Sequence, residues 1–264
     1  RFESPVEHAE GDSAARLQAL VSPFVLRRVK EDVVADLPEK IEDTVMAQLT
    51  GEQRKLYLAN QDRIAQQVQH REAGEFKKDK LKVLAELTKL RQICCDPRLH
   101  YEDYKAGSAK LDTCMELVHG ALDGGHRILL FSQFTGMLDI IGKRLAKEDI
   151  AFLKLTGASS KESRAKMVAQ FQAGEVPVFL ISLKAGGVGL NLTAADVVIH
   201  YDPWWNVAAQ DQATDRAHRI GQQHTVTVYK LIAKDTIEER IMQMQESKRD
   251  LVNSVLGGDG ISSA

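Results

Sequence analysis

Short apolar segments alternate with amphipathic segments through the second half of the chain. The apolar segments are RILLF, FLKL, VPVFLI, VVIHY and VTVYKL, at residues 127–131, 152–155, 176–181, 197–201 and 226–231. Segments of this length without polar alternation are typical of strands buried on both faces. Helices are predicted between and after them, at residues 136–147, 160–171, 207–220 and 236–253. Strands that alternate with helices predict an α/β fold with a parallel sheet covered by helices on both faces.

Residues 50–93 show a helical spacing of apolar positions. They predict a helical hairpin that ends at the segment CCDPRLH. The spacing of a capping box predicts three helix starts, at Thr50 with Gln53, Ser159 with Glu162, and Asp235 with Glu238. Gly174 is predicted to follow the end of the helix at 160–171. Residues 1–49 have little periodicity, so we interpret them as a partly ordered connector.

The composition is that of an ordinary globular protein, because 44% of the 264 residues are hydrophobic and 27% are charged. No apolar segment approaches the ~18 residues of a membrane span, and the polar start of the chain does not resemble a signal peptide. We therefore expect no membrane contact. The first residue is not methionine, so we expect the chain to be part of a longer protein.

Charge and cysteine usage narrow the classes of partner and site. The net charge is −2, so any nucleic-acid interface must be a local patch. Cys94, Cys95 and Cys114 have neither a metal-binding spacing nor the even number typical of a disulfide framework. We expect reduced thiols and no metal site in this chain.

The segment DQATDRAHRIGQ, residues 211–222, contains the strongest candidate for phosphate chemistry. In a helix, Gln212, Arg216 and Arg219 follow the spacing that places side chains on one face. Two permanently charged guanidinium groups and an amide on one face suggest a site for an anion such as phosphate. The alternative is a solvated helix face. The DPWWN turn at 202–206 favours the anion site, because it fixes the direction of the segment that follows.

A glycine-rich segment, SLKAGGVGLN, directly follows a predicted strand at residues 182–191. Gly186, Gly187 and Gly189 allow the backbone to turn sharply or to approach a ligand closely. Backbone N–H groups exposed in such a loop can bind an anion. A plain tight turn explains the same residues, so this segment alone does not decide between the two readings.

Polar residues follow three of the predicted strands. Because the carboxyl ends of parallel strands share one edge of a sheet, we expect these residues to lie on a common rim. Their hydroxyl, amide and backbone groups are of the kind that hold phosphate oxygens without reading bases. They predict a path for a nucleic-acid backbone along Ser132, Gln133, Thr156, Gly157, Ser182 and Lys184.

The sequence lacks the other half of a nucleotide-hydrolysing site. Gly136, Gly142 and Lys143 approximate a phosphate loop, but the spacing is one residue too long and Arg144 stands in place of serine or threonine. No Asp-Glu dipeptide occurs anywhere in the sequence, so the usual acidic magnesium-binding box is missing. The sequence therefore predicts one side of a phosphate site at Arg216 and Arg219 without the other side.

Four segments, in this order, resemble the second motor lobe of the Swi/Snf-type DNA translocases of helicase superfamily two. They are ILLFSQF, LTG, ISLKAGGVGLNLTAADVVIHYDPWWN and DQATDRAHRIGQ. PFVLRRVKEDVVADLPEK resembles the connector from the first lobe of that family. The hairpin is similar to the protrusion of the family's second lobe, and residues 235–255 to its brace helix. Val207 follows Asn206 where proline is more usual, a small departure.

The resemblance implies a RecA-like fold and a division of the chain into four parts. These are a connector at 1–49, a helical protrusion at 50–105, the second motor lobe at 106–234, and a brace helix and tail at 235–264. In this family ATP binds between two lobes, and the first lobe mainly holds Mg²⁺. The chain is then part of a DNA-dependent ATPase, a double-stranded DNA translocase or remodeller, and is inactive without the first lobe.

The resemblance also implies roles for individual residues. Arg216 and Arg219 would reach the terminal phosphates of ATP, with Arg219 assigned as the arginine finger. Such an arginine stabilises the charge that develops during phosphoryl transfer. Four further residues would support the nucleotide or couple it to the DNA loop, namely Gly187, Gly189, Asn191 and Gln212.

Two other classes of protein remain as alternatives. One is an RNA helicase lobe of the wider superfamily. The DPWWN and LRRVKEDV segments argue against this alternative. The other is a non-catalytic binding module with a flavodoxin-like fold. Within the translocase reading, the remodelled target could be a nucleosome, a polymerase or another DNA-bound protein. A bacterial source implies cytoplasm near the nucleoid, and a eukaryotic source implies the nucleus.

Overall fold

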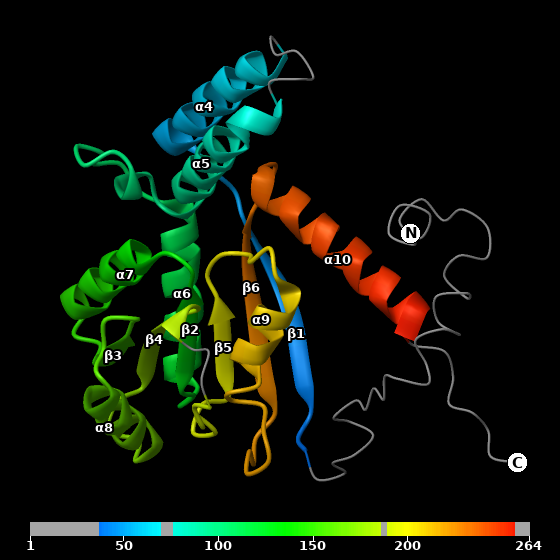
Figure 1. Ribbon diagram of the computed structural model, residues 1–264. Helices are drawn as coiled ribbons and strands as arrows, with labels where there is room; N and C mark the ends of the chain where they lie inside the picture. The colour runs from blue at the N-terminus through cyan, green and yellow to red at the C-terminus, as the bar shows by residue number, and fades with distance from the viewer. Residues whose placement is uncertain (1–36, 70–75, 186–188, 257–264) are drawn as a thin grey trace, which may run out of the picture. The chain divides into compact units, whose positions relative to one another are not determined.

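The computed structural model describes residues 37–69, 76–185 and 189–256 of the chain (Figure 1). Residues 37–241 form one compact unit, and the chain beyond residue 241 belongs to a second unit. The sheet and the candidate site lie in the first unit. Among the described residues, no helix combines the length and the apolar character needed to cross a membrane.

The first unit is built on a six-stranded sheet in the order β1-β6-β5-β2-β4-β3. Every pairing between neighbouring strands is parallel. The predicted α/β fold with a parallel sheet is therefore confirmed. The strands are β1 Lys40–Ala47, β2 Ile128–Ser132, β3 Phe152–Leu155, β4 Val178–Ser182, β5 Val197–His200 and β6 Val226–Ala233.

Helices cover both faces of the sheet, as the apolar strands predict. The side chains of Ile128 and Leu130 pack under α6 and α7, whereas those of Leu129 and Phe131 pack under α8 and α9. Strand residues alternate between faces, so the apolar residues 128–131 of β2 are divided between the two layers. The helices are α4 Gly51–Gln69, α5 Phe76–Cys95, α6 Ala109–Asp123, α7 Thr135–Lys147, α8 Lys161–Gln172, α9 Val207–Thr214 and α10 Ile237–Leu256, with a 3₁₀ turn η1 at Pro97–Leu99.

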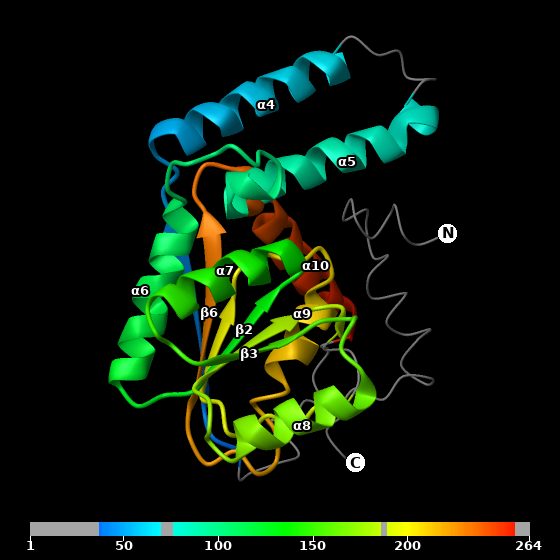
Figure 2. The ribbon, with the colours of Figure 1, turned by 90° about the vertical axis from the view of Figure 1, so that its left-hand side faces the viewer.

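The helices α4 and α5 form the predicted hairpin and lie side by side beyond the sheet (Figures 1 and 2). Its base packs in a small apolar cluster that includes Leu49, Tyr57 and Ile93. The buried Gln53 amide fastens this base, because it donates to the Ile93 carbonyl at 2.9 Å and accepts from the Ala109 N–H at 3.1 Å. The hairpin thus has a fixed root in the sheet unit.

The strand β1 was not predicted, because residues 1–49 lack a strand pattern. Most of its residues are exposed, so the apolar alternation that marks a strand is missing. Backbone pairing with β6 over its whole length makes it an edge strand instead. Glu42 reinforces the pairing through an ion pair with Lys230 of β6 at 2.5 Å, and it also pairs with Lys40 of its own strand at 2.8 Å. The predicted connector therefore contributes residues 40–47 to the sheet.

The predicted capping boxes are wrong in detail. The helix α8 begins after Ser160, whose side chain accepts from the Ser163 N–H, so the cap is one residue later than predicted. Gln53 is buried in the contacts just described. At α10 the Thr236 hydroxyl accepts from the Glu238 N–H, while the Glu238 carboxylate contacts Lys110. Gly174 does follow the end of α8 in a left-handed conformation, with φ +77, as predicted.

Candidate functional site

The arginine pair lies in a series of turns and not on a helix. The helix α9 ends at Thr214, so the prediction of a helix over 207–220 is wrong in its second half. Short-range bonds replace the helical ones, from Arg216 N to Ala213 O at 3.2 Å and from Ala217 N to Thr214 O at 3.0 Å. Burial of Ala213 and Ala217 against the sheet holds this segment, which we call the arginine turn (residues 215–222).

The two arginines differ in their surroundings. Arg216 is only 7% exposed, and within the described part of the chain its Nε has no hydrogen-bond partner. Burial, together with the nearby charge of Arg219, lowers the pKa of the Arg216 guanidinium, and Asp215 opposes that shift. Arg219 is exposed. A buried cation with an unused donor beside a second, exposed cation is an arrangement suited to a polyanion such as a phosphate chain.

The glycine-rich loop after β4 reaches the arginine turn. Leu192 at the end of this loop donates its N–H to the carbonyl of Arg216 at 3.0 Å. Gly187 lies outside the described residues. Gly189 is exposed in a left-handed conformation with φ +51, and Asn191 is exposed beside it. The segment that follows the glycine-rich loop and the arginine turn, which are separated in sequence, are therefore in contact at Leu192.

The arginine turn lies toward the amino ends of the strands. His218 Nε2 contacts the carbonyl of Pro38, just before β1, at 2.8 Å. Gln222 donates to the carbonyl of Ala195, just before β5, at 2.7 Å. Gln212 is exposed on α9, the helix that leads into this turn. The candidate phosphate site is thus on a different part of the surface from the polar rim at the carboxyl ends.

The polar rim forms along three adjacent strands, as predicted, but two of its members are buried. Ser132 and Ser182 are paired across β2 and β4 and are at most 2% exposed. The Ser132 hydroxyl donates to Asp202 at 2.5 Å. Their side chains lie beneath the rim, which corrects the expectation that Ser132 and Ser182 contact a ligand. A strand that is buried on both faces also buries its last side chain.

The other predicted rim residues are accessible. Lys184 and Gly157 are exposed, and Thr156 is half-buried. Gln133 is half-buried, and its amide nitrogen donates to the Asp202 carboxylate at 2.5 Å. The structure therefore keeps a polar edge at the ends of β2, β3 and β4, with Lys184 as its exposed cation.

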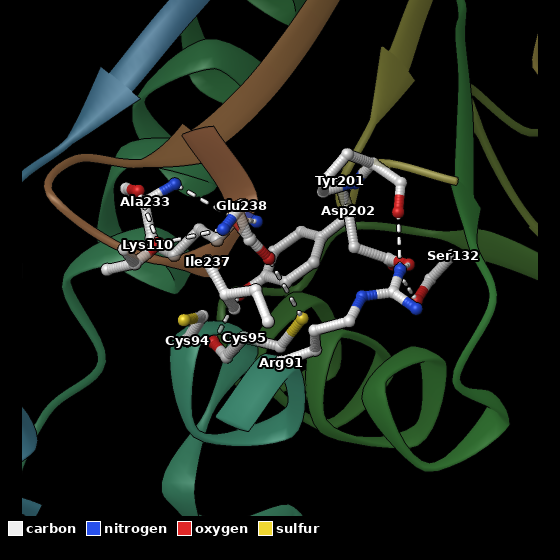
Figure 3. Close-up of polar contacts among 12 residues, drawn as sticks. Arg91, Cys94, Cys95, Lys110, Ser132, Tyr201, Asp202, Ala233, Ile237 and Glu238 are labelled. Carbon is white, nitrogen blue, oxygen red and sulfur yellow. Dashed lines mark hydrogen bonds and ion pairs between the residues drawn. The ribbon is translucent and has the colours of Figure 1, made fainter. Parts of the chain in front are cut away.

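A buried polar network beneath this rim was missed by sequence reasoning (Figure 3). Its centre is Asp202, and burial raises the pKa of that carboxyl. Arg91, from α5, lies 3.9 Å from Asp202 and is 3% exposed on its side chain. The only sequence signal is a charged residue in the apolar end of the hairpin, LRQICC, where a solvent-facing position is the default expectation.

A second buried pair lies beside the first (Figure 3). Lys110 on α6 and Glu238 at the start of α10 are both fully buried and 2.5 Å apart. Burial opposes the charge on Lys110, but the Glu238 carboxylate outweighs it and raises the pKa of the lysine. Tyr201 is next to Asp202 in the chain and contacts the second group. Its hydroxyl donates to the Cys95 carbonyl at 2.9 Å, and its ring faces Lys110.

The described residues hold no group of three or more His, Cys, Asp or Glu side chains that could bind a metal. Cys94, Cys95 and Cys114 are free and buried, and burial raises the pKa of the Cys114 thiol to about 12.

Comparisons with known proteins show which families the chain resembles. Residues 109–221 match the helicase conserved C-terminal domain, and residues 1–99 match the SNF2-related domain. The putative ATP-dependent helicase/translocase YwqA of Bacillus subtilis is 39% identical, over 97% of this chain and 28% of that protein. The chain spans less than a third of the length of the curated relatives it matches.

Two solved structures from Sulfolobus solfataricus share the fold. The SWI2/SNF2 ATPase C-terminal domain is 34% identical with a TM-score of 0.68, over 86% of this chain and 91% of that chain. The SWI2/SNF2 ATPase core in complex with dsDNA is 36% identical with a TM-score of 0.71, over 95% of this chain and 54% of that chain.

Proposed function

The chain belongs to the SWI2/SNF2 family of ATPases, and we propose that it is the second motor lobe of an ATP-dependent double-stranded DNA translocase. In this role it supplies arginines to ATP bound against the first lobe and contacts the DNA backbone along its polar rim. The first motor lobe of the same polypeptide and duplex DNA are its partners. A DNA-bound protein displaced by the motor is a further partner in this proposal.

The observation that carries the proposal is the meeting of the arginine turn and the glycine-rich loop. Arg216 has an unused buried donor, and the bond from Leu192 N to Arg216 O holds the loop beside it. ATP with Mg²⁺ supplies the phosphoryl group, and Mg²⁺ is held mainly by the first lobe in this proposal. Arg216 orients the phosphate chain, and the exposed Arg219 stabilises charge that develops during transfer. Gly187, Gly189, Asn191 and Gln212 are proposed to support the nucleotide.

The DNA path is proposed to follow Gln133, Thr156, Gly157 and Lys184. The Sulfolobus relative was solved with duplex DNA, which supports the same class of ligand here. With a net charge of −2, binding must rest on a few placed contacts and not on diffuse attraction. Ser132 and Ser182 are retained only as buried supports of this rim.

Family membership removes the flavodoxin-like binding module from the alternatives. An RNA helicase lobe differs from the proposal in its ligand, so nucleic-acid preference decides between the two. The cellular location follows the source in this proposal, which is the cytoplasm near the nucleoid in a bacterium or the nucleus in a eukaryote.

The first prediction tests the proposal directly. This chain alone is expected to show no ATP turnover, because its sequence carries neither a phosphate loop nor an acidic box. Joined to its first lobe, the protein is expected to hydrolyse ATP and to be stimulated by duplex DNA more than by RNA. Turnover is measured with no nucleic acid, with duplex DNA and with RNA. Turnover that follows the isolated chain through gel filtration contradicts the prediction, and stimulation mainly by RNA favours the helicase alternative.

The second prediction concerns the exposed cation of the rim. Replacing Lys184 with alanine in the two-lobe protein is expected to weaken duplex binding equally for unrelated base sequences, because the contact is to phosphate. One lost phosphate contact lowers the slope of log K against log salt by about one unit. Duplex titrations at several salt concentrations measure both effects. Lys166→Ala on α8, an exposed lysine away from the rim, is the matched control. An unchanged slope moves the DNA path to another surface.

A further inference from the structure

We propose that Arg91 is a positioning residue that joins the helical hairpin to two loops at the carboxyl edge of the sheet, and that this joint couples DNA binding to ATP hydrolysis. The inference deepens the proposed function and rests on it. The first loop follows β2 at residues 133–134, and we call it the DNA loop. The second follows β5 at residues 202–206, and we call it the tryptophan turn.

The guanidinium of Arg91 bonds to both loops at once. Its Nη1 donates to the side-chain oxygen of Gln133 at 2.9 Å. Its Nη2 donates to the carbonyl of Pro203, in the tryptophan turn. A planar fork can bridge two acceptors in fixed directions, whereas the ammonium of a lysine is a point charge without that geometry. Arginine is therefore suited to hold the two loops in a fixed position relative to each other.

Aromatic side chains from the same two loops flank Arg91. The guanidinium carbon lies 5.7 Å from the ring centre of Phe134 and 5.4 Å from that of Trp205. Phe134 belongs to the DNA loop and Trp205 to the tryptophan turn. These distances allow cation–π attraction. Each loop thus meets Arg91 through a hydrogen bond and a ring.

Asp202 closes the network from the other side. It accepts from the amide nitrogen of Gln133 at 2.5 Å, while the amide oxygen of Gln133 faces Arg91. Both ends of this amide are held in the structure, so Gln133 can turn toward DNA only if the network rearranges. A DNA contact that moves Gln133 would therefore change the hydrogen bonds of Arg91 and the position of the tryptophan turn.

The tryptophan turn leads to the nucleotide side of the lobe. The N–H of Trp204 donates to Gln210 of α9 at 3.4 Å. The helix α9 then runs into the arginine turn, with Arg216 and Arg219. Arg91 is thus placed between the proposed DNA contact and the proposed catalytic arginines, without belonging to either. A group so placed changes how strongly one site responds to the other.

The test uses the two-lobe protein and separates coupling from stability. Arg91→Lys keeps the charge and the apolar stem but removes the fork. It is expected to lower the ratio of DNA-stimulated to basal turnover about tenfold, within the usual range of coupling between sites. Basal turnover is expected to stay within about twofold, and the duplex concentration for half-maximal stimulation within about threefold. Arg91→Met, which removes the charge, is expected to lower the ratio further.

The matched control is Arg63→Ala, an exposed arginine of the same hairpin that pairs with Glu86 at 2.5 Å. It is expected to leave the ratio unchanged. A ratio for Arg91→Lys within twofold of the parent protein overturns the inference, and so does an equal loss of basal and stimulated turnover. Were Arg91→Met to fail to fold, Arg91→Lys would decide alone. An inactive Arg219→Ala protein together with a normal Arg91→Lys protein rejects this inference and leaves the proposed function standing.

Discussion

Replacing Arg219 with alanine in the two-lobe protein is expected to lower DNA-stimulated ATP turnover by about 10³-fold, the usual cost of losing an arginine finger. Arg219 is exposed in the arginine turn, so it can reach a phosphate bound against another lobe. Nucleotide affinity is expected to change far less, because a finger acts mainly on the transition state. Steady-state turnover and equilibrium nucleotide binding measure the two quantities separately.

Two further variants sharpen this prediction. Arg219→Lys keeps a positive charge without the fork and is expected to restore only a small part of the turnover. Arg54→Ala, at an exposed arginine on α4, is the matched control and is expected to turn over normally. Near-normal stimulated turnover of Arg219→Ala would make the pair a solvated surface and remove the main support for the proposed function.

Arg219 is preferred to Arg216 for this experiment because of burial. Arg216 is 7% exposed, so its side chain packs inside the lobe. A loss of turnover in Arg216→Ala would therefore mix a catalytic effect with the loss of that buried side chain. The exposed partner separates the two causes, because its side chain has little packing to lose.

The sheet could be predicted from the sequence because its central strands carry a strong local signal. Residues 128–132 and 178–182 are buried at every position, and all but the last residue of each is apolar, which leaves few alternatives. The edge strand at 40–47 gives no such signal, since its polar, exposed residues are held by backbone pairing with β6 and by Glu42. Its place depends on a partner almost 190 residues away, which local patterns do not reveal.

The candidate site was predicted by residue type better than by geometry. The sequence indicated Arg216 and Arg219 as candidates but predicted a helix over 207–220 to carry them. In the structure this helix, α9, ends at Thr214. The mainly polar and small residues of 211–222 fit both a helix and a series of turns, and burial of Ala217 against the sheet favours the turns. Long-range packing also buries Ser132, which local sequence placed on an exposed rim.

The buried charges could not be predicted, because a charged residue in an amphipathic helix is normally assigned to the solvent side. Arg91 and Lys110 each occupy a position that becomes interior only when distant elements pack around it. Their partners lie 111 and 128 residues further along the chain, at Asp202 and Glu238. Such pairs become visible only in the folded structure, and they are where single substitutions should have large effects.

Replacing Lys110 with methionine is expected to lower the free energy of unfolding by about 3–5 kcal/mol, because it leaves the buried Glu238 carboxylate without its cation. Methionine keeps most of the volume of the lysine stem, so little of the loss comes from packing. Burial already raises the pKa of Glu238, which indicates that its charged form depends on compensation by Lys110. Urea unfolding of the chain, followed by circular dichroism, measures the change.

The double variant Lys110→Met with Glu238→Gln separates a broken pair from a damaged core. The Glu238 carboxylate accepts a hydrogen bond from the Ala233 N–H at 2.8 Å. Glutamine keeps an acceptor for this bond but carries no charge. Removing both charges of a buried pair is often nearly neutral, so the double variant is expected to recover most of the lost stability. Lys154→Met, at an exposed pair with Asp139, is the control and is expected to cost less than about 1 kcal/mol. A double variant as unstable as Lys110→Met would show that packing around the lysine, and not the unpaired carboxylate, dominates.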